Sequence, residues 1–297
     1  MMMSIDLTTS PDAMPRPRLE RQAFELRALT SGLLTLLTWT IAILGSIPLF
    51  SVIFMLVSEG GARLDWQALT ALPPAGFELG GGFGNAIVGT LVMVGIATAI
   101  SVPFGLLAAI YLAVLGPHSQ VANVARFVAK TLTGFPSILA GVFVYGVLVI
   151  SFGYSALAGG VALAVLMLPT VILAAEEAMK QVPTRMTDAA YGMGCTRSQV
   201  IWKVVLPTGV PGILTGVMLA VAGAAGESAP LLFTALFSNY YLSELMEPTA
   251  SLSILIYNFS AMPFQNQIEL AWAASLVLVL IVLVFNILAR VIGRPKV

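Results

Sequence analysis

Long apolar segments alternate with polar loops over most of the sequence. The apolar segments cover residues 33–57, 86–115, 132–151, 156–175, 204–236 and 270–292. A helix rises about 1.5 Å per residue, so each segment can cross a hydrocarbon core about 30 Å thick. The pattern therefore predicts six transmembrane helices. Phe152-Gly153-Tyr154 is nearly the whole connection between the third and fourth of them, which requires a tight turn.

The N-terminal segment, residues 1–29, is polar and contains several prolines and arginines, so we expect a tail without a core of its own. The apolar run that follows is about twice as long as the core of a secretory signal, which has about 7–15 residues. It also lacks a clear cleavage site. We interpret this run as a retained transmembrane helix.

Lysine and arginine are distributed unequally between the two sides that six helices define. Arg63 alone falls on one side, and the other basic residues lie in the two tails and in the loops after the second and fourth helices. Lysine and arginine accumulate in cytoplasmic loops. We therefore expect both termini in the cytoplasm, and an even number of helices agrees with this orientation.

Helix spacing and orientation together predict the organisation of the chain. The expected parts are a cytoplasmic tail at 1–29, a first helix at 30–57, an outer loop at 58–85, a transmembrane domain at 86–292 with a cytoplasmic loop at 176–203 and an outer loop at 237–269, and a cytoplasmic tail at 293–297. Residues 252–257 within the second outer loop are too apolar for a solvated linker, so we expect a short packed helix there.

Composition agrees with a membrane protein and leaves little material for catalysis. The chain is 58% hydrophobic and 9% charged, too few charges for the surface of a soluble domain of this size. Its formal net charge of zero gives no indication of a nucleic-acid partner. Cys195 is the only cysteine and His118 the only histidine, which excludes an intramolecular disulfide and disfavours metal clusters and Ser-His-Asp catalysis. We expect no catalytic residue and no metal in this chain.

A nucleotide site of its own is not expected either, because no glycine-rich loop ends in GK[ST]. The run GGGFG at 80–84 lacks the GxGxxG spacing and lies on the outer side. We interpret it as a flexible turn into the second helix, with Asn85 as a candidate helix cap.

The segment DAAYGMGCTRSQVIWKVVLP, residues 188–207, carries the most specific pattern. It resembles the coupling motif EAA-x3-G-x9-I-x-LP of permeases of binding-protein-dependent ABC importers. An interfacial hairpin is the alternative, and the cytoplasmic placement favours the motif. The matching residues are Asp188, Ala189, Ala190, Gly194, Val204, Leu206 and Pro207, with Asp in place of Glu and Val in place of Ile.

In such permeases this loop forms a helix that sits in a groove of a separate ATPase subunit. Two small alanines would allow close approach, the Asp188 carboxylate would meet a basic rim, and Gly194 would turn the chain back toward the membrane. Leu206-Pro207 would stiffen the start of the fifth helix. The resemblance therefore assigns ATPase coupling to Asp188, Ala189, Ala190, Gly194, Leu206 and Pro207.

A second resemblance narrows the family. GESAPLLFTA at 226–235 is similar to the GETAPLLFTA segment of the PstA family of phosphate importer permeases, and TGFPSILAGV at 133–142 resembles that family's proline-serine kink. Residues in the second outer loop follow the same family's order: Met246, Pro248, Ser251, Leu252, Ile256, Tyr257, Pro263 and Phe264. The likeness covers about residues 86–290.

The resemblance implies an all-α integral membrane protein with six transmembrane helices and the type I ABC importer permease fold. It implies a non-catalytic permease subunit of a phosphate importer in the inner membrane. The implied partners are a second phosphate permease subunit, two copies of a cytoplasmic ATPase subunit that bind ATP and Mg, and an extracytoplasmic phosphate-binding protein. No cofactor is implied in this chain.

Glu227 is a single carboxylate among small and apolar residues. An unpaired carboxylate within a membrane costs about 2.5–3.5 kcal/mol on insertion scales. The family usually has an arginine four residues earlier, where this chain has Gly223, and Lys203 lies about six turns away. A cation from a partner chain, a water-filled cavity, or protonation with hydrogen bonding would each offset the cost.

Two readings of Glu227 remain open at this level. A protonated glutamate can simply join helices. Alternatively, it accepts a hydrogen bond from phosphate, which keeps at least one proton near neutral pH, and repels fully deprotonated sulfate. The hydroxyls of Ser228 and Ser137 are companion pathway residues under the second reading, against helix-internal bonding. The alternative functions are import of another oxyanion, or an ion-coupled secondary transporter that uses Glu227.

Overall fold

The computed structural model describes residues 26–292, and all regular secondary structure in this range is helical. The predicted tails at 1–29 and 293–297 lie almost entirely outside the described residues. The α-helices are α1 Leu26–Met55, α2 Trp66–Thr70, α3 Gly84–Ile110, α4 Gln120–Thr133, α5 Ser137–Val144, α6 Ile150–Phe152, α7 Ala156–Lys180, α8 Thr184–Gly192, α9 Arg197–Val200, α10 Leu206–Gly226, α11 Ala229–Thr234, α12 Leu252–Ser260 and α13 Gln265–Ile292. Four π-helical segments are η1 Leu56–Gly60, η2 Tyr111–Leu115, η3 Tyr145–Val149 and η4 Ile201–Val205.

The chain divides into two compact units, residues 1–53 and 54–297. Most of α1 belongs to the first unit, and its apolar side chains are exposed. The hydroxyls of Thr35, Thr38, Thr40 and Ser46 each donate to the carbonyl one turn earlier, at 2.7–2.9 Å. Polar groups satisfied within the helix in this way, together with an apolar surface, suit a membrane span.

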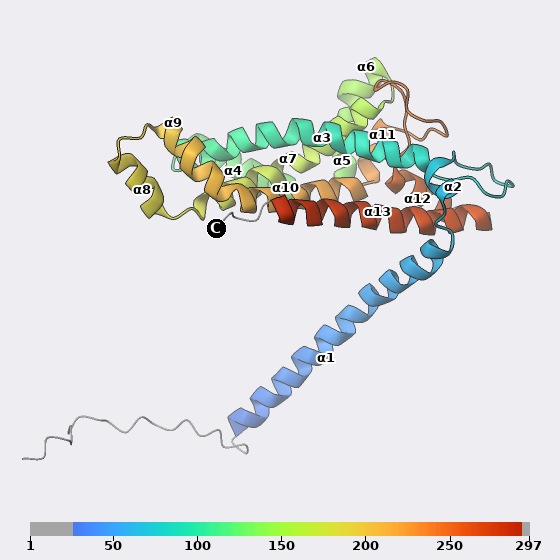
Figure 1. The fold of residues 1–297 in the computed structure, drawn as a ribbon, viewed down its shortest axis with the longest axis horizontal. Coiled ribbons are helices and arrows are strands. Elements are labelled where there is room, and N and C mark those ends of the chain that lie inside the picture. Colours follow the sequence, from blue (N-terminus) through green and yellow to red (C-terminus); the bar gives the residue numbers. More distant parts are fainter. Residues whose placement is uncertain (1–25, 293–297) are drawn as a thin grey trace, which may run out of the picture. The chain divides into compact units, whose positions relative to one another are not determined.

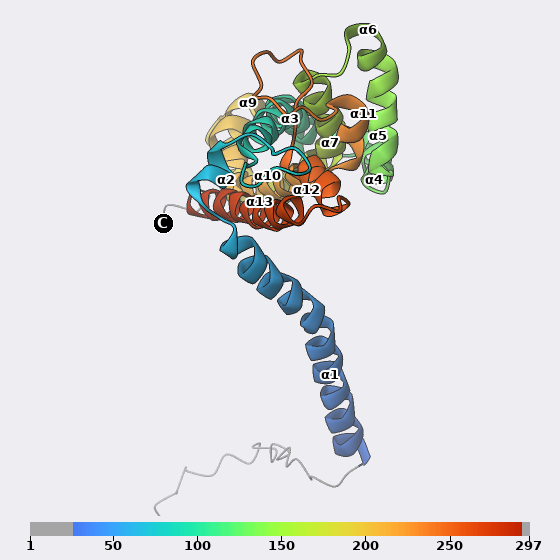
Figure 2. The ribbon, with the colours of Figure 1, turned by 90° about the vertical axis from the view of Figure 1, so that its right-hand side faces the viewer.

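The second unit is a bundle in which α7 lies between α3 and α10, with α13 packed against α10 (Figures 1 and 2). Small residues bring these helices close together. A Cβ at Gly105 of α3 would lie 2.7 Å from Val171 of α7, and a Cβ at Gly160 would lie 2.6 Å from Ile96. Close approach through glycine is the usual way in which membrane helices associate, since lipid supplies no hydrophobic driving force.

Five helices in the described range are long and apolar enough to cross a membrane, and a bent pair gives a sixth. The bent pair is α4 followed by α5 to α6, with an angle of 105° between them. The predicted third helix, 132–151, therefore begins too early, because the helix is interrupted after Thr133 and the next one begins at Ser137. Pro136 explains the break, because it lacks an amide hydrogen and disfavours the helical conformation of Phe135.

The predicted fifth helix, 204–236, is wrong at both ends of its range. One continuous helix runs from Arg197 to Gly226. It is interrupted at Glu227 and Ser228, and α11 begins at Ala229. Glu227 caps α10 with an extended backbone, φ −75° and ψ 122°. The tight turn predicted at 152–154 is present, and Gly153 supplies its positive φ of 85°.

Two expectations for the outer loops have different outcomes. The short helix expected around 252–257 is present as α12, and the Ser251 hydroxyl caps it by accepting from the Ile254 amide. Asn85 is not a helix cap: it lies inside α3, and its Nδ2 donates to the Ser238 carbonyl at 2.8 Å. The glycine run before it is closely packed, since a Cβ at Gly82 would overlap the carbonyl of Ala68.

Candidate functional site

Two helix breaks meet inside the second unit. The short helices α5 and α11 each begin directly after a break, and they lie side by side (Figures 1 and 2). A Cβ at Gly141 of α5 would lie only 2.7 Å from Cα of Pro230 in α11. The two helices run in the same direction, because α6 ends at Phe152 and the nearby Ser155 amide donates to Thr234 at the end of α11. The two breaks therefore lie at the same end of this contact.

Three polar side chains stand at the breaks. Ser137 is the first residue of α5, and Glu227 and Ser228 directly precede α11; all three are half-buried. Within the described range, the Glu227 carboxylate has no ion pair and none of the three side chains has a hydrogen-bond partner. The helix-internal bonding weighed for Ser137 and Ser228 is therefore not found among these residues.

The main chain at Glu227 is held more firmly than its side chain. Its carbonyl accepts a hydrogen bond of 2.9 Å from the Ser253 hydroxyl, and Ser253 in turn contacts the Ser251 hydroxyl at 3.0 Å. The Leu252 amide donates to Thr90 of α3 at 2.8 Å. Thr90, Ser251 and Ser253 are all buried. This network connects the break to both α12 and α3, so the position of Glu227 depends on two neighbouring helices.

The space beside Glu227 is open at Gly223, the position four residues earlier. Gly223 is exposed, and a Cβ built on it would meet nothing within 4 Å. Gly223 lies one turn before Glu227 on α10. A larger side chain at position 223 thus has room beside the break.

The predicted coupling loop forms α8, at the opposite end of the bundle from α12 (Figure 1). Asp188 and Ala189 are exposed on α8, whereas Ala190 is 3% exposed and belongs to the main hydrophobic core of the bundle. Gly194 has a φ of 81°, the left-handed conformation that the turn requires. Only one of the two small residues therefore faces outward.

A rigid connection leads from this loop to the break. Thr196 and Gln199 form a capping box at the start of α9, and α9, η4 and α10 continue as one helix. Leu206-Pro207 lies directly after the π-helical segment, which accommodates the missing amide of the proline. Any displacement of the α8–α9 loop can therefore be transmitted along α10 toward Glu227.

A charged cluster near the α8 end could not be found from sequence. Glu176 Oε1 lies 2.6 Å from both Arg126 Nε and Lys180 Nζ, and the Glu176 side chain is 4% exposed. Arg126 Nη2 also donates to the Leu112 carbonyl at 2.7 Å, and Arg197 Nη2 donates to the Val114 carbonyl at 2.9 Å. Arg126 and Glu176 are 50 residues apart in the sequence, and local spacing gives no sign of the pair. The cluster holds the end of α3–η2 to α4, α7 and α9.

Comparison with known proteins identifies the family. Residues 101–295 match the family model described as "Binding-protein-dependent transport system inner membrane component". The chain is 38% identical to the phosphate transport system permease protein PstA of Yersinia pestis, over 99% of each chain. It is 40% identical to PstA of Haemophilus influenzae, over 88% of this chain and 92% of the relative. The chain belongs to the PstA family.

Solved structures agree on the fold. A chain of the inward-facing MetNI methionine ABC transporter matches with a TM-score of 0.57 and 19% identity, over 71% of this chain and 94% of that chain. A chain of a bacterial alginate ABC transporter, in complex with an alginate-bound periplasmic protein, matches with a TM-score of 0.61 and 16% identity, over 92% and 98%. The predicted all-α fold of a type I ABC importer permease is confirmed. This chain is a multi-pass membrane protein.

Proposed function

We infer that this chain is the permease subunit of an ATP-driven importer that moves inorganic phosphate across the cytoplasmic membrane. The observation that carries this function is its similarity to PstA permeases over nearly the whole chain. The helix breaks agree with it, because they place one carboxylate and two hydroxyls without partners, within the described residues, at a single junction. Broken helices with exposed polar groups are typical of transport pathways.

The chemistry of the junction suits a protonated oxyanion. Phosphate keeps at least one proton near neutral pH, so it can donate a hydrogen bond to the Glu227 carboxylate. The hydroxyls of Ser137 and Ser228 can donate to the remaining phosphate oxygens. Sulfate has no proton to donate and would meet only repulsion from a carboxylate. Glu227 is therefore the residue to which we assign discrimination between the two anions.

The opposite end of the bundle suits contact with an ATPase. α8 exposes Asp188 and Ala189, a carboxylate and a small residue that fit close to a basic groove. Gly194 and Leu206-Pro207 shape the connection to α10. We propose that two ATPase copies bind ATP and Mg, and that their closure moves α8 and, through α10, the break at Glu227. We expect no nucleotide site and no cofactor in this chain itself.

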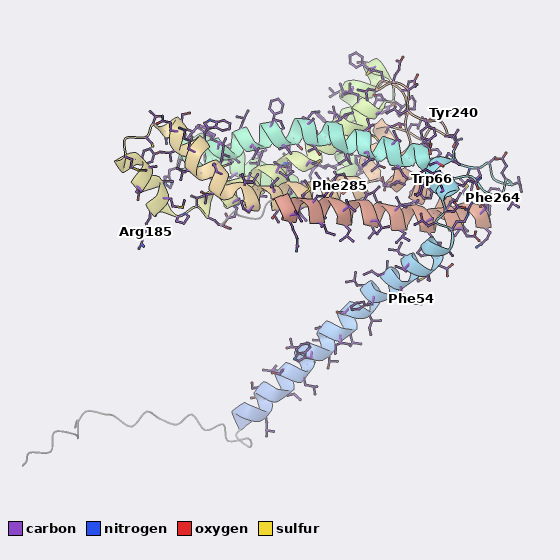
Figure 3. The ribbon with its side chains drawn as sticks, viewed as in Figure 1. Phe54, Trp66, Arg185, Tyr240, Phe264 and Phe285 are labelled. Carbon is purple, nitrogen blue, oxygen red and sulfur yellow. The ribbon has the colours of Figure 1, made fainter. Side chains whose placement is uncertain are left out.

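Orientation follows from the same arrangement. Arg185 lies at the α8 end of the bundle, and Tyr240 lies at the other end (Figure 3). The basic residues Lys180, Arg197 and Lys203 flank α8 in sequence, which favours the cytoplasmic side for this end. Both termini would then be cytoplasmic. An extracytoplasmic phosphate-binding protein would dock at the opposite end, and a second permease subunit would complete the pathway.

Reconstitution tests the function directly. The complex of this chain with its permease and ATPase partners, in proteoliposomes with binding protein, should accumulate labelled phosphate only when ATP is inside the vesicles. Glu227→Gln should lower phosphate uptake about tenfold or more and reduce the preference over sulfate. Equal uptake of both anions by the unmodified complex would favour another oxyanion. Transport that needs a proton gradient and no ATPase would overturn the proposal.

Association with the ATPase tests the assignment of α8. Ala189→Trp should abolish co-purification of the ATPase, because the large ring would block close approach of the two surfaces. Leu79→Trp, an exposed position in the loop between α2 and α3, is the matched control and should leave co-purification intact. Equal recovery of the ATPase with both variants would show that α8 is not the contact.

A further inference from the structure

A pocket opens at the end of the bundle opposite α8, in the loop between α11 and α12. It has a volume of about 560 Å³, and it is lined by residues 236–241 together with Ser243, Glu247 and Pro248. The labelled Tyr240 in Figure 3 marks this end of the molecule. The pocket is separate from the junction of α5 and α11, since none of Ser137, Glu227 and Ser228 lines it.

The loop around the pocket is fixed at several points. The Tyr241 hydroxyl donates to the Thr70 carbonyl, and Asn85 Nδ2 donates to the Ser238 carbonyl at 2.8 Å. The Glu247 carbonyl accepts from the Ala156 amide at 3.0 Å, at the start of α7. Leu236 holds a positive φ of 60°, which is rare for leucine and turns the chain into the loop. The pocket is thus preformed by contacts with α2, α3 and α7.

The pocket carries a negative charge beside aromatic rings. The Glu247 carboxylate accepts a hydrogen bond of 2.6 Å from Ser243, and it has no cationic partner in the described part of the chain. Residues 237–269 contain no lysine, arginine or histidine. Tyr240, which lines the same pocket, is 74% exposed. A carboxylate and an accessible tyrosine ring in one pocket are the combination that binds a guanidinium or ammonium group.

Charge also decides against the substrate as the occupant. The Glu247 carboxylate already accepts the Ser243 hydroxyl, and no cation lines the pocket to offset its repulsion of an anion such as phosphate. Arg63 is the only basic residue in the two outer loops, and it pairs with Asp65 at 3.3 Å, so this end offers no free cation among the described residues. The family is named for dependence on a binding protein, which must deliver its cargo at the end away from the ATPase. A basic side chain on that protein complements the pocket.

We propose that the pocket at 236–248 is a docking site for an arginine of the extracytoplasmic binding protein, with Glu247 as its ion-pair partner and Tyr240 as its stacking surface. Arginine fits better than lysine, because its planar group can pair with the carboxylate and lie on the ring together. This inference rests on the proposed function. It adds the chemistry by which the binding protein is recognised and placed over the pathway.

Affinity of the phosphate-loaded binding protein for the assembled complex in nanodiscs tests the proposal. Glu247→Gln should weaken binding about tenfold or more and flatten its dependence on salt, because the ion pair is lost. Glu244→Gln is the matched control, since Glu244 is exposed in the same loop and does not line the pocket. Tyr240→Leu should also weaken binding, whereas Tyr240→Phe should retain it. Elution of each variant complex on size exclusion confirms assembly.

Several outcomes would overturn the docking site. Equal affinities for Glu247→Gln and Glu244→Gln would do so, as would an unchanged salt dependence. A change in the oligomeric state of the Glu247→Gln complex, with unchanged affinity for the binding protein, would assign the pocket to a second copy instead. ATP-driven phosphate uptake by the unmodified complex distinguishes failure of the proposed function from failure of the docking site. If the unmodified complex takes up no phosphate, the proposed function is contradicted. If it does, and Glu247→Gln binds the binding protein as tightly as the unmodified complex, only the docking site is contradicted.

Discussion

The Ser253 hydroxyl donates a hydrogen bond to the Glu227 carbonyl at 2.9 Å, although the two residues are 26 positions apart in the sequence. Ser253 belongs to α12, a short helix in the loop before α13, and Glu227 stands in the break between α10 and α11. The bond therefore ties a loop helix at the end of the bundle opposite α8 to the residue that we place in the phosphate pathway. Movement of α12 and the position of Glu227 are coupled by this contact.

Removing the Ser253 hydroxyl should displace Glu227 without altering its side chain. Ser253→Ala leaves the Glu227 carbonyl without its partner, which costs about 1–3 kcal/mol where the group is buried. We expect the concentration of binding protein for half-maximal phosphate uptake to stay the same and maximal uptake to fall several-fold. Ser253→Thr keeps a hydroxyl and should restore most of the uptake, measured with labelled phosphate in proteoliposomes.

The matched control for that experiment is Ser260→Ala. Ser260 lies on the same helix, is exposed, and donates only to the Tyr257 carbonyl one turn earlier. Its removal should leave uptake unchanged. Equal uptake by Ser253→Ala and Ser260→Ala would contradict a positioning role for Ser253.

Contact between α5 and α11 should depend on one glycine. A Cβ at Gly141 would lie 2.7 Å from Pro230 Cα and 2.8 Å from its carbonyl oxygen, and both are main-chain atoms that cannot rotate away. Gly141→Ala should therefore separate the helices and destabilise the complex by about 1–3 kcal/mol through overpacking. We expect a lower melting temperature and reduced phosphate uptake.

Gly146 gives the comparison in the same span. A Cβ at Gly146 would meet nothing within 4 Å, so Gly146→Ala should be neutral or stabilise the helix by up to about 1 kcal/mol. Thermal unfolding of both variants in the same detergent measures the difference. Similar melting temperatures for the two alanine variants would show that the α5–α11 contact contributes little.

Helix breaks were predicted poorly from the sequence, and the prolines show why. Pro103, Pro169 and Pro211 all lie inside helices that continue, whereas Pro136 lies in the break between α4 and α5, and Pro230 is the second residue of α11. A proline within an apolar run therefore does not by itself predict whether a membrane helix stops, because neighbouring helices can satisfy the freed carbonyl at some prolines and not at others. The Glu227 carbonyl at the second break is bound by Ser253 of α12, a contact between residues 26 positions apart that local sequence does not reveal.

Local patterns were more informative. The spacing from Asp188 to Gly194 predicted the α8 turn, and the positive φ of Gly194 agrees with it, because both features lie within a few residues. The inward direction of Ala190 could not be predicted, since it depends on tertiary packing in the core that Val200 and Ile201 also join. The pairing of Arg126 with Glu176 was missed for the same reason: tertiary structure alone brings α4 to α7.

Breaking the Arg126–Glu176 pair should destabilise the α8 end. Glu176 is buried, so removal of Arg126 leaves its charge with Lys180 alone and frees the carbonyls that Arg126 holds. Loss of one partner of a buried pair costs about 3–5 kcal/mol, which Lys180 should reduce here. We expect Arg126→Gln to lower the melting temperature of the complex and the ATPase activity that phosphate-loaded binding protein stimulates.

Lys130→Gln is the control for charge on the same helix. Lys130 is exposed on α4 and has no ion pair within the described residues. Its replacement should change stability by less than about 0.5 kcal/mol. If Arg126→Gln melted at the same temperature as Lys130→Gln, the cluster of Arg126, Glu176 and Lys180 would not contribute to the stability of the complex.

Room beside Gly223 allows the charge arrangement at Glu227 to be tested. A Cβ at position 223 meets nothing within 4 Å, so Gly223→Arg should fold, and its guanidinium can reach the Glu227 carboxylate one turn away. If a partner chain already supplies a cation to Glu227, a second cation should weaken that contact and lower uptake several-fold. If Glu227 acts without a cation, the added arginine should attract phosphate and hold uptake near the unmodified level.

Gly223→Leu separates charge from size in this experiment, because leucine fills the same space without a charge. Labelled phosphate uptake of the two variants, measured against sulfate competition, gives the comparison. We expect Gly223→Arg to retain uptake within about threefold and to exceed Gly223→Leu, since Glu227 has no ion pair within the described chain and an ion pair here offsets the cost of an isolated buried carboxylate. Lower uptake for arginine than for leucine would instead place a cation of the second permease subunit beside Glu227.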